Sequence, residues 1–317
     1  MVTLDGRLDQ VNTFYCYRVS LHEFPPTLPS LEKMIIKSTS TIGFEAPKLT
    51  KLVWYQEFNE MAPPFGNHFS NLRSLYICGG QMIIDLTGLM ALKKLVLDCS
   101  MLRAPVDLDP LINLEFLHII DPEENVVKNI PDCLKTLRIS LAKSSFAECF
   151  TTELSNLNLI RFEFLTPSLS VRRSADISGY LEQLANCIAL QHLKIECTNN
   201  CILPHLGKFT QIKVLDLVQF TKMDMGSELT KEEIIELSKQ LPSTRVYWGY
   251  RQPTTIKRPK NDHWFTERLE LSELIPFDCG CEYCKAMDRG FFEEEYDASR
   301  STICYDPKPF KPHWSWY

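Results

Sequence analysis

Four cysteines near the C-terminal end of the chain have a spacing that suits metal chemistry. Cys279, Cys281 and Cys284 form a Cys-x-Cys-x-x-Cys run, and Cys304 follows later in the same segment. Zinc in proteins binds four thiolate or imidazole ligands in a tetrahedron, and a Cys-x-x-Cys pair supplies two of them from one turn. The four cysteines are therefore candidate ligands of a structural zinc ion. Because no second Cys-x-x-Cys pair is present, an ordinary cluster of reduced thiols and a reactive thiol pair stay open as alternatives.

The sequence carries no motif of a known catalytic site. It has no glycine-rich nucleotide-binding loop, no Gly-x-Ser-x-Gly elbow and no His-Glu-x-x-His pair. Its 7 histidines have no partner at a spacing typical of a metal site or a catalytic triad. We therefore expect that the protein is not an enzyme and that it needs no cofactor apart from the candidate zinc ion.

Charge and composition exclude several classes of partner. The chain has 317 residues, of which 44% are hydrophobic, and a formal net charge of -6. A general nucleic-acid-binding protein would need a basic surface along the phosphates. No apolar run approaches the roughly 20 residues of a membrane-spanning helix, and the opening residues lack the features of a signal peptide. We expect neither nucleic acid nor membrane as a partner, and scattered single cysteines favour the cytoplasm or the nucleus.

An apolar pattern recurs from residue 11 to about residue 220. It reads Leu-x-x-Leu-x-Leu, with other apolar residues as substitutes, and its spacing varies between 18 and 31 residues. The last apolar positions alternate with polar ones, so each unit predicts a short strand with one face in a core. The ten units begin at Val11, Leu31, Leu49, Leu72, Leu92, Leu114, Leu134, Leu159, Leu190 and Ile212.

This pattern resembles that of leucine-rich repeat proteins, in which each unit supplies one short strand and a return segment. The resemblance implies an α/β repeat solenoid over residues 1–250, with about ten to eleven repeats and a parallel concave sheet on a horseshoe or arc. Most units are too short for an outer helix, so the convex side should be thin and mostly non-helical. The irregular spacing, and the lack of Asn or Cys three residues after the last apolar position, resemble the divergent repeats of F-box leucine-rich proteins, although no F-box is seen.

Two segments predict helices. Ile177, Leu181, Leu184 and Ile188 have the spacing of one helical face, and the run from Thr230 to Glu233 is a capping box that starts a second helix.

Residues 251–317 are rich in proline, cysteine and aromatic residues, which favours an irregular C-terminal cap over the last repeat. The alternative is a tail that meets a partner. Only ten residues precede the first predicted strand. We expect either that another chain covers this N-terminal edge or that the reading frame starts inside a longer ancestral architecture.

The sheet face opposite the core is the predicted binding surface. Its strand positions carry seven Lys or Arg against four Asp or Glu, although the whole chain is acidic. This inversion suggests an acidic or phosphorylated protein segment as ligand, held by aromatic anchors. A role of the lysines in solubility alone stays open. The candidate ligand-binding residues are Tyr15, Tyr17, Lys33, Lys37, Lys51, Tyr55, Tyr76, Lys94, Phe116, Arg138, Arg161 and Lys194.

We therefore expect a protein–protein interaction module. The resemblance to F-box leucine-rich proteins implies a substrate-recognition subunit of a ubiquitin ligase or a related adaptor, with ligase components among its partners. The alternative is a constitutive scaffold subunit of a larger assembly.

Overall fold

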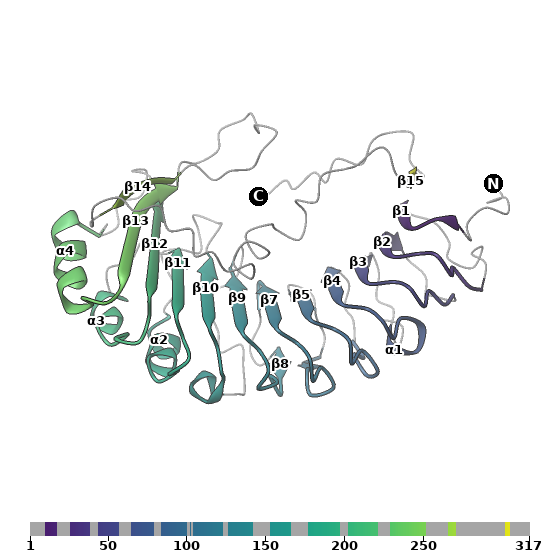
Figure 1. Cartoon of the computed structure of the whole chain (residues 1–317), viewed down its shortest axis with the longest axis horizontal. Helices are drawn as coiled ribbons and strands as arrows, with labels where there is room; N and C mark the ends of the chain where they lie inside the picture. The colour runs from purple at the N-terminus through teal and green to yellow at the C-terminus, as the bar shows by residue number, and fades with distance from the viewer. Residues whose placement is uncertain are drawn as a thin grey trace.

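The computed structural model describes residues 10–17, 26–38, 44–56, 65–78, 84–99, 102, 104–122, 126–141, 153–165, 177–196, 202–220, 229–251, 266–270 and 302–304, and all structural statements refer to these residues. Its main feature is a 13-stranded sheet bent into an arc (Figure 1). The strand order is β14-β13-β12-β11-β10-β9-β7-β5-β4-β3-β2-β1-β15.

The strands from β1 to β13 in this sheet pair in parallel, each with the strand of the next repeat. This is the predicted leucine-rich-repeat arc with a parallel sheet, so the fold class is confirmed. The bounds are β1 Thr13–Tyr17, β2 Lys33–Ser38, β3 Lys51–Gln56, β4 Ser74–Cys78, β5 Lys94–Asp98, β7 Phe116–Ile120, β9 Thr136–Ser140, β10 Arg161–Leu165, β11 His192–Glu196, β12 Val214–Phe220 and β13 Arg245–Arg251.

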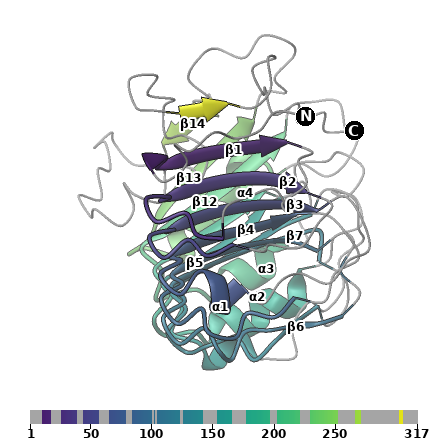
Figure 2. The same cartoon turned by 90° about the vertical axis from the view of Figure 1, so that its right-hand side faces the viewer.

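The outer side of the arc is thin, as the short repeats predict. The described helices lie on this side (Figures 1 and 2). None of the helices that the structure describes is both long and apolar enough to span a membrane. The bounds are α1 Phe65–His68, a 3₁₀ turn Leu154–Asn156, α2 Ser178–Ala185, α3 Leu203–Leu206 and α4 Lys231–Gln240, together with a two-stranded outer sheet of β6 Val106–Asp107 and β8 Val127–Lys128.

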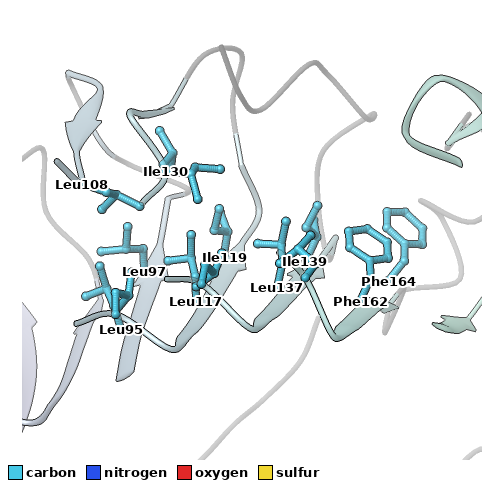
Figure 3. Packing of buried hydrophobic residues seen from close by; sticks show 14 of the residues in the cluster. Leu95, Leu97, Leu108, Leu117, Ile119, Ile130, Leu137, Ile139, Phe162 and Phe164 are labelled. Atoms are coloured by element: carbon cyan, nitrogen blue, oxygen red, sulfur yellow. The ribbon is translucent and has the colours of Figure 1, made fainter. Parts of the chain in front are cut away.

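The core is a continuous stack of the repeat's apolar positions. Leu95 and Leu97 of β5 pack beside Leu117 and Ile119 of β7, and the stack continues along the arc (Figure 3). Leu95 and Leu117 are partners in the register of neighbouring strands. The alternation of side chains in a strand therefore sends the same position of every repeat into the core.

Each strand begins with a backbone contact that repeats along the arc. The carbonyl of Arg73 accepts hydrogen bonds from the backbone N–H groups of Lys93 and Lys94, at 2.9 and 3.0 Å. The carbonyl of Lys93 accepts in the same way from Glu115 and Phe116 in the next coil. This double acceptance recurs from the carbonyl of Asn12 to that of Gln191, so it holds successive coils in one register.

Polar side chains also join the coils, at the turn before the strand. The side-chain amide of Asn71 donates to the carbonyl of Pro47, and that of Asn113 donates to the carbonyl of Met90, both at 2.8 Å. Gln211 does the same for the carbonyl of Cys187, at 3.2 Å. The leucine-rich-repeat pattern used to read the sequence places such polar residues after the strand. Asn71, Asn113 and Gln211 precede their strands, so that pattern did not predict them.

The two helix predictions have different outcomes. The capping box is confirmed, because Thr230 Oγ1 accepts from the backbone of Glu233 and the Glu233 carboxylate accepts from the backbone of Thr230. The prediction for the other helix is wrong at the C-terminal end. The helix stops at Ala185, and Ile188 is 91% exposed.

Both edges of the sheet are paired with strands from residues 251–317. Strand β14 (Thr266–Glu270) pairs antiparallel with β13 at one edge. Strand β15 (Thr302–Cys304) pairs in parallel with β1 at the other, with Thr302 beside Thr13. For the N-terminal edge we expected either that another chain covers it or that the reading frame starts inside a longer ancestral architecture. Strand β1 at this edge pairs with a strand of the same chain. An edge strand presents unpaired backbone groups, which these pairings satisfy in part.

Two glycines meet where neighbouring coils approach on the outer side. A Cβ atom added to Gly66 would lie 2.6 Å from the Cα atom of Gly88, which is backbone that cannot move aside easily. Gly88 itself has φ of +85°, a conformation that glycine adopts without strain. This contact therefore requires glycine on both coils.

We expect Gly66→Ala to destabilise the fold by about 2 kcal/mol or more, because the new methyl group must push two coils apart. Gly179→Ala is the matched control, since a Cβ there meets nothing within 4 Å and alanine favours the helix. Urea unfolding of both variants checks this. Equal unfolding midpoints for Gly66→Ala and the parent would contradict the close approach of the two coils.

Candidate functional site

Strand register arranges the predicted ligand-binding residues in rows across the concave face. Tyr76, for example, lies between the core residues Leu75 and Ile77, so its side chain is on the opposite face of β4. The backbones of Tyr15, Tyr17 and Lys37 lie in β1 and β2, but their side chains are outside the described part. The middle row, from β2 to β12, is Ile35, Val53, Tyr76, Val96, His118, Arg138, Glu163, Lys194 and Asp216.

An apolar patch occupies this face over strands β3 to β7. Its centre consists of Val53, Tyr76, Val96 and Phe116, which are 1–3% exposed and form a cluster separate from the core. We call these four residues the concave patch. The Tyr55 ring lies edge-on to the Tyr76 ring, with centroids 5.6 Å apart. Three of the predicted aromatic anchors are thus brought together, and the residues packed against the patch are Ile35, Tyr55, Cys78 and Ile120.

Two basic side chains lie over the aromatic end of the concave patch. Lys94 Nζ is 4.7 Å from the centroid of the Phe116 ring, and Arg138 Cζ is 5.6 Å from it. Both distances permit cation–π attraction. Burial of Lys94, and then the positive charges of Arg138 and Lys51, lower the pKa of its ammonium group to about 8. This end of the patch therefore has a positive potential that a negatively charged ligand would relieve.

A buried carboxylate joins two of the predicted basic residues. Glu163 is 2% exposed, and its two oxygens pair with Arg138 Nε, at 2.6 Å, and with Arg161 Nε. Burial raises the pKa of Glu163, but Arg138, Arg161 and Lys194 outweigh that effect and lower it to about 2. Part of the predicted positive charge of the concave face is therefore neutralised. Sequence analysis missed this role of Glu163, although its position between Arg138 and Lys194 follows from the register.

His118 lies between the concave patch and this ion cluster. Its Nε2 is 2.8 Å from Ser140 Oγ, and its ring centroid is 6.5 Å from that of Phe116. Burial, and then the charge of Arg138, hold the pKa of this imidazole well below its usual range. His118 is therefore neutral at pH 7, and it fills the face as a polar packing residue.

The two parts of the concave face differ in charge. Among the described side chains, strands β2 to β7 carry Lys33, Lys51 and Lys94 on the concave face, against Asp98 as the acidic residue. Strands β9 to β12 are balanced, with three residues of each sign: Arg138, Arg161 and Lys194 with Glu163, Glu196 and Asp216. The excess of positive charge and the concave patch thus lie on the same strands.

The zinc prediction falls largely outside the described residues. Cys279, Cys281 and Cys284 are not described, and only the backbone of Cys304 is placed, in β15. Within the described ranges, no three His, Cys, Asp or Glu side chains are grouped so as to hold a metal ion. The zinc site therefore stays a prediction.

Glu163→Gln should lower stability at neutral pH by about 3 kcal/mol, because it removes the partner of two partly buried guanidinium groups. The folded-state pKa of about 2 lies below the usual value of 4.5, so the carboxylate stabilises the fold above pH 4.5 and stops doing so as the pH falls toward 2. Unfolding of the variant and the parent from pH 7 to pH 2 measures this. A difference in stability that does not shrink with acid would contradict the ion cluster.

Lys94→Met should raise stability by about 1 kcal/mol at pH 7, after allowance for solvent screening, because burial disfavours the ammonium group. Between pH 8 and pH 10.5 the folded parent loses this proton before the unfolded chain does, so the parent should regain stability and the gain should shrink. Lys93→Met, at the exposed neighbouring position, is the control. A loss of stability for Lys94→Met would contradict this prediction, because it would show that the contacts of the ammonium group outweigh the cost of its burial.

Comparisons with known proteins add little to this geometry. No protein-family model and no curated protein matches the chain. Among solved structures, the chain is similar to an internalin (inlF) from Listeria monocytogenes, with 16% sequence identity and a TM-score of 0.38 over 71% of this chain and 69% of that one. The strand register and the buried repeat positions carry the fold assignment, and they describe a leucine-rich-repeat type of solenoid.

Proposed function

We propose that the protein is a protein–protein interaction module that binds an acidic or phosphorylated segment on the concave face over strands β2 to β7. The observation that supports this most is the position of Lys94 and Arg138 over Phe116, at the end of the concave patch. Apolar and aromatic contact area provides affinity, and nearby cations select a negatively charged partner.

The binding mode follows from the shape of the surface. An extended segment that crosses the strands would place an apolar side chain against Ile35 and Tyr55, which border the concave patch. Its acidic side chains would then lie beside Lys51 and Lys94. The contact with Tyr55 should control the rate of dissociation, because this partly buried ring would lose its remaining contact with water in the complex. The lysines should mainly control the rate of association, and salt should weaken that effect.

Binding of short fluorescent peptides tests this proposal. An acidic or phosphorylated peptide that contains an aromatic residue should bind the parent, and a neutral peptide of the same apolar content should not. Lys51→Glu/Lys94→Glu should slow association by about tenfold at low salt. Lys213→Glu/Lys239→Glu changes the charge equally at exposed positions outside the concave face and should leave binding intact. Equal association rates for both double variants would contradict the proposed surface.

A narrower proposal concerns the biological setting. The irregular repeats support a substrate-recognition subunit of an F-box-type ubiquitin ligase or a related adaptor, and the alternative is a constitutive scaffold subunit. Capture of the native protein at increasing salt separates the two. Ligase components that remain bound while the acidic client is released would support the adaptor. A single partner that co-purifies in equal amount at every salt concentration would support the scaffold.

A further inference from the structure

One end of the concave patch places two cations against a single aromatic ring. Lys94 of β5 and Arg138 of β9 both lie over Phe116, which belongs to the strand between them, β7. Lys51 of β3 is a third positive charge that acts on Lys94. Lys94 therefore has positive charge on both sides along the sheet. An anion that contacts more than one of these cations would stabilise such a partly buried arrangement.

A buried carboxylate orients Arg138. The carboxylate of Glu163, which is 2% exposed, accepts from Arg138 Nε at 2.6 Å and also from Arg161 Nε. A guanidinium group is planar, so a contact at Nε also fixes the direction of its two terminal nitrogens. These terminal nitrogens are the donors that a bound anion can use. The side chain of Arg138 is 25% exposed, so an anion from solvent can reach it.

Lys94 is the cation that gains most from a bound anion. Burial, and then the charges of Arg138 and Lys51, lower the pKa of its ammonium group to about 8. A negative charge beside Lys94 Nζ opposes both effects, because it replaces lost solvation and offsets the neighbouring charges. Binding of an anion should therefore raise the pKa of Lys94 toward its usual value.

The number of charges favours a phosphoryl group over a carboxylate. A carboxylate carries a single charge on two oxygens, whereas the phosphoryl group of a phosphorylated residue carries about −1.5 to −2 on three oxygens. A phosphoryl group can therefore accept from an ammonium and a guanidinium group at once, and the terminal nitrogens of arginine match its geometry. One compact group with this charge offsets Lys94 and Arg138 together.

We propose that Lys94 and Arg138 bind one phosphoryl group of a phosphorylated protein segment. This inference rests on the proposed function, because it names the chemical group that the same surface selects. Glu163 is then a positioning residue, since it holds the guanidinium group of Arg138 in the orientation that the phosphoryl oxygens need. Phosphorylation of the partner, more than its general acidity, controls binding.

The surroundings of Lys94 leave it as the group whose titration responds to the ligand. Burial is the main cause that raises the pKa of Tyr76 on β4 and lowers that of His118 on β7, both far from their usual ranges, so neither changes its charge between pH 7 and pH 9. The other charged or titratable side chains described on the concave face of β3 to β10 are Lys51, Tyr55, Cys78, Asp98, Arg138, Arg161 and Glu163.

Three matched fluorescent peptides test the choice of group on the full chain. They share one alanine- and glycine-based sequence with a single phenylalanine, and differ at one position that is phosphoserine, glutamate or serine. At pH 7 the phosphoserine peptide should bind about tenfold more tightly than the glutamate peptide. Inorganic phosphate should displace it only at about 100-fold higher concentration, because it lacks the aromatic contact. Equal affinity for the phosphoserine and glutamate peptides would overturn the proposal, and so would equal affinity for inorganic phosphate and the phosphoserine peptide.

Substitutions test the two cations separately. Lys94→Met should weaken binding of the phosphoserine peptide about tenfold and remove most of its advantage over the glutamate peptide. Arg138→Lys keeps the charge but cannot contact Glu163 and the phosphoryl group together, so it should weaken binding about fivefold. Lys213→Met, at an exposed position outside the concave face, is the control and should bind as the parent does. Circular dichroism checks that each variant is folded. Full phosphoserine preference in both Lys94→Met and Arg138→Lys would overturn the proposal.

Proton uptake on binding gives an independent readout. At pH 8 about half of the free protein carries the Lys94 proton, so binding should take up about half a proton. Above pH 8 the ammonium group must regain its proton to bind, so affinity should fall as the pH rises. Lys94→Arg stays charged and should show neither effect. Calorimetry in buffers of different ionisation enthalpy measures the uptake, and equal uptake by the parent and Lys94→Arg would overturn the proposal.

The outcomes also separate this inference from the proposed function. Equal binding of the phosphoserine and glutamate peptides, with slower association for Lys51→Glu/Lys94→Glu, would keep the acidic partner and overturn the phosphoryl site. Binding of neither peptide at low salt would overturn both. Tight binding of the phosphoserine peptide alone, lost in Lys94→Met, would support both and identify phosphorylation as the signal that the surface reads.

Discussion

The backbone hydrogen bonds at the start of each strand are the interaction on which the rest of the structure depends. One carbonyl of each coil accepts two N–H groups of the next coil, from Asn12 to Gln191. Each strand is therefore held level with its neighbour, whatever the length of the intervening segment. Repeats of unequal length still stack, because the register depends on these bonds and not on the number of residues between two strands.

A constant register turns residues that are distant in sequence into neighbours on one surface. Tyr76, Val96 and His118 come from three repeats and lie side by side in the middle row. The core is uniform along the arc because the same repeat positions fill it, but the concave rows are free to vary. One half of the concave face is apolar and basic. In the other half, charges are paired around Glu163. This difference, more than total charge, is what supports our proposal of an acidic partner.

Much of the fold could be predicted from the sequence, because Leu95, Leu97 and their counterparts recur with a period that few folds require. The concave rows also followed from the period. The pairing of Glu163 with two arginines did not, since it depends on side-chain conformations of three strands. The end of α2 before Ile188 and the contact of Gly66 with Gly88 depend on how coils meet. The pairing of β15 with β1 joins the two ends of the chain, and no local pattern indicates such a contact.

The central claim is that the concave patch and the lysines around it form the binding surface. Photo-cross-linking from a benzophenone side chain placed at Tyr55, which borders the patch, measures this most directly. The control position is Ile112, an exposed apolar residue in a turn outside the concave face. Our account predicts products from position 55 that map to acidic segments with an aromatic residue in a partner, and none of these from position 112. Products that come only from position 112, or that lack acidic segments, would contradict it.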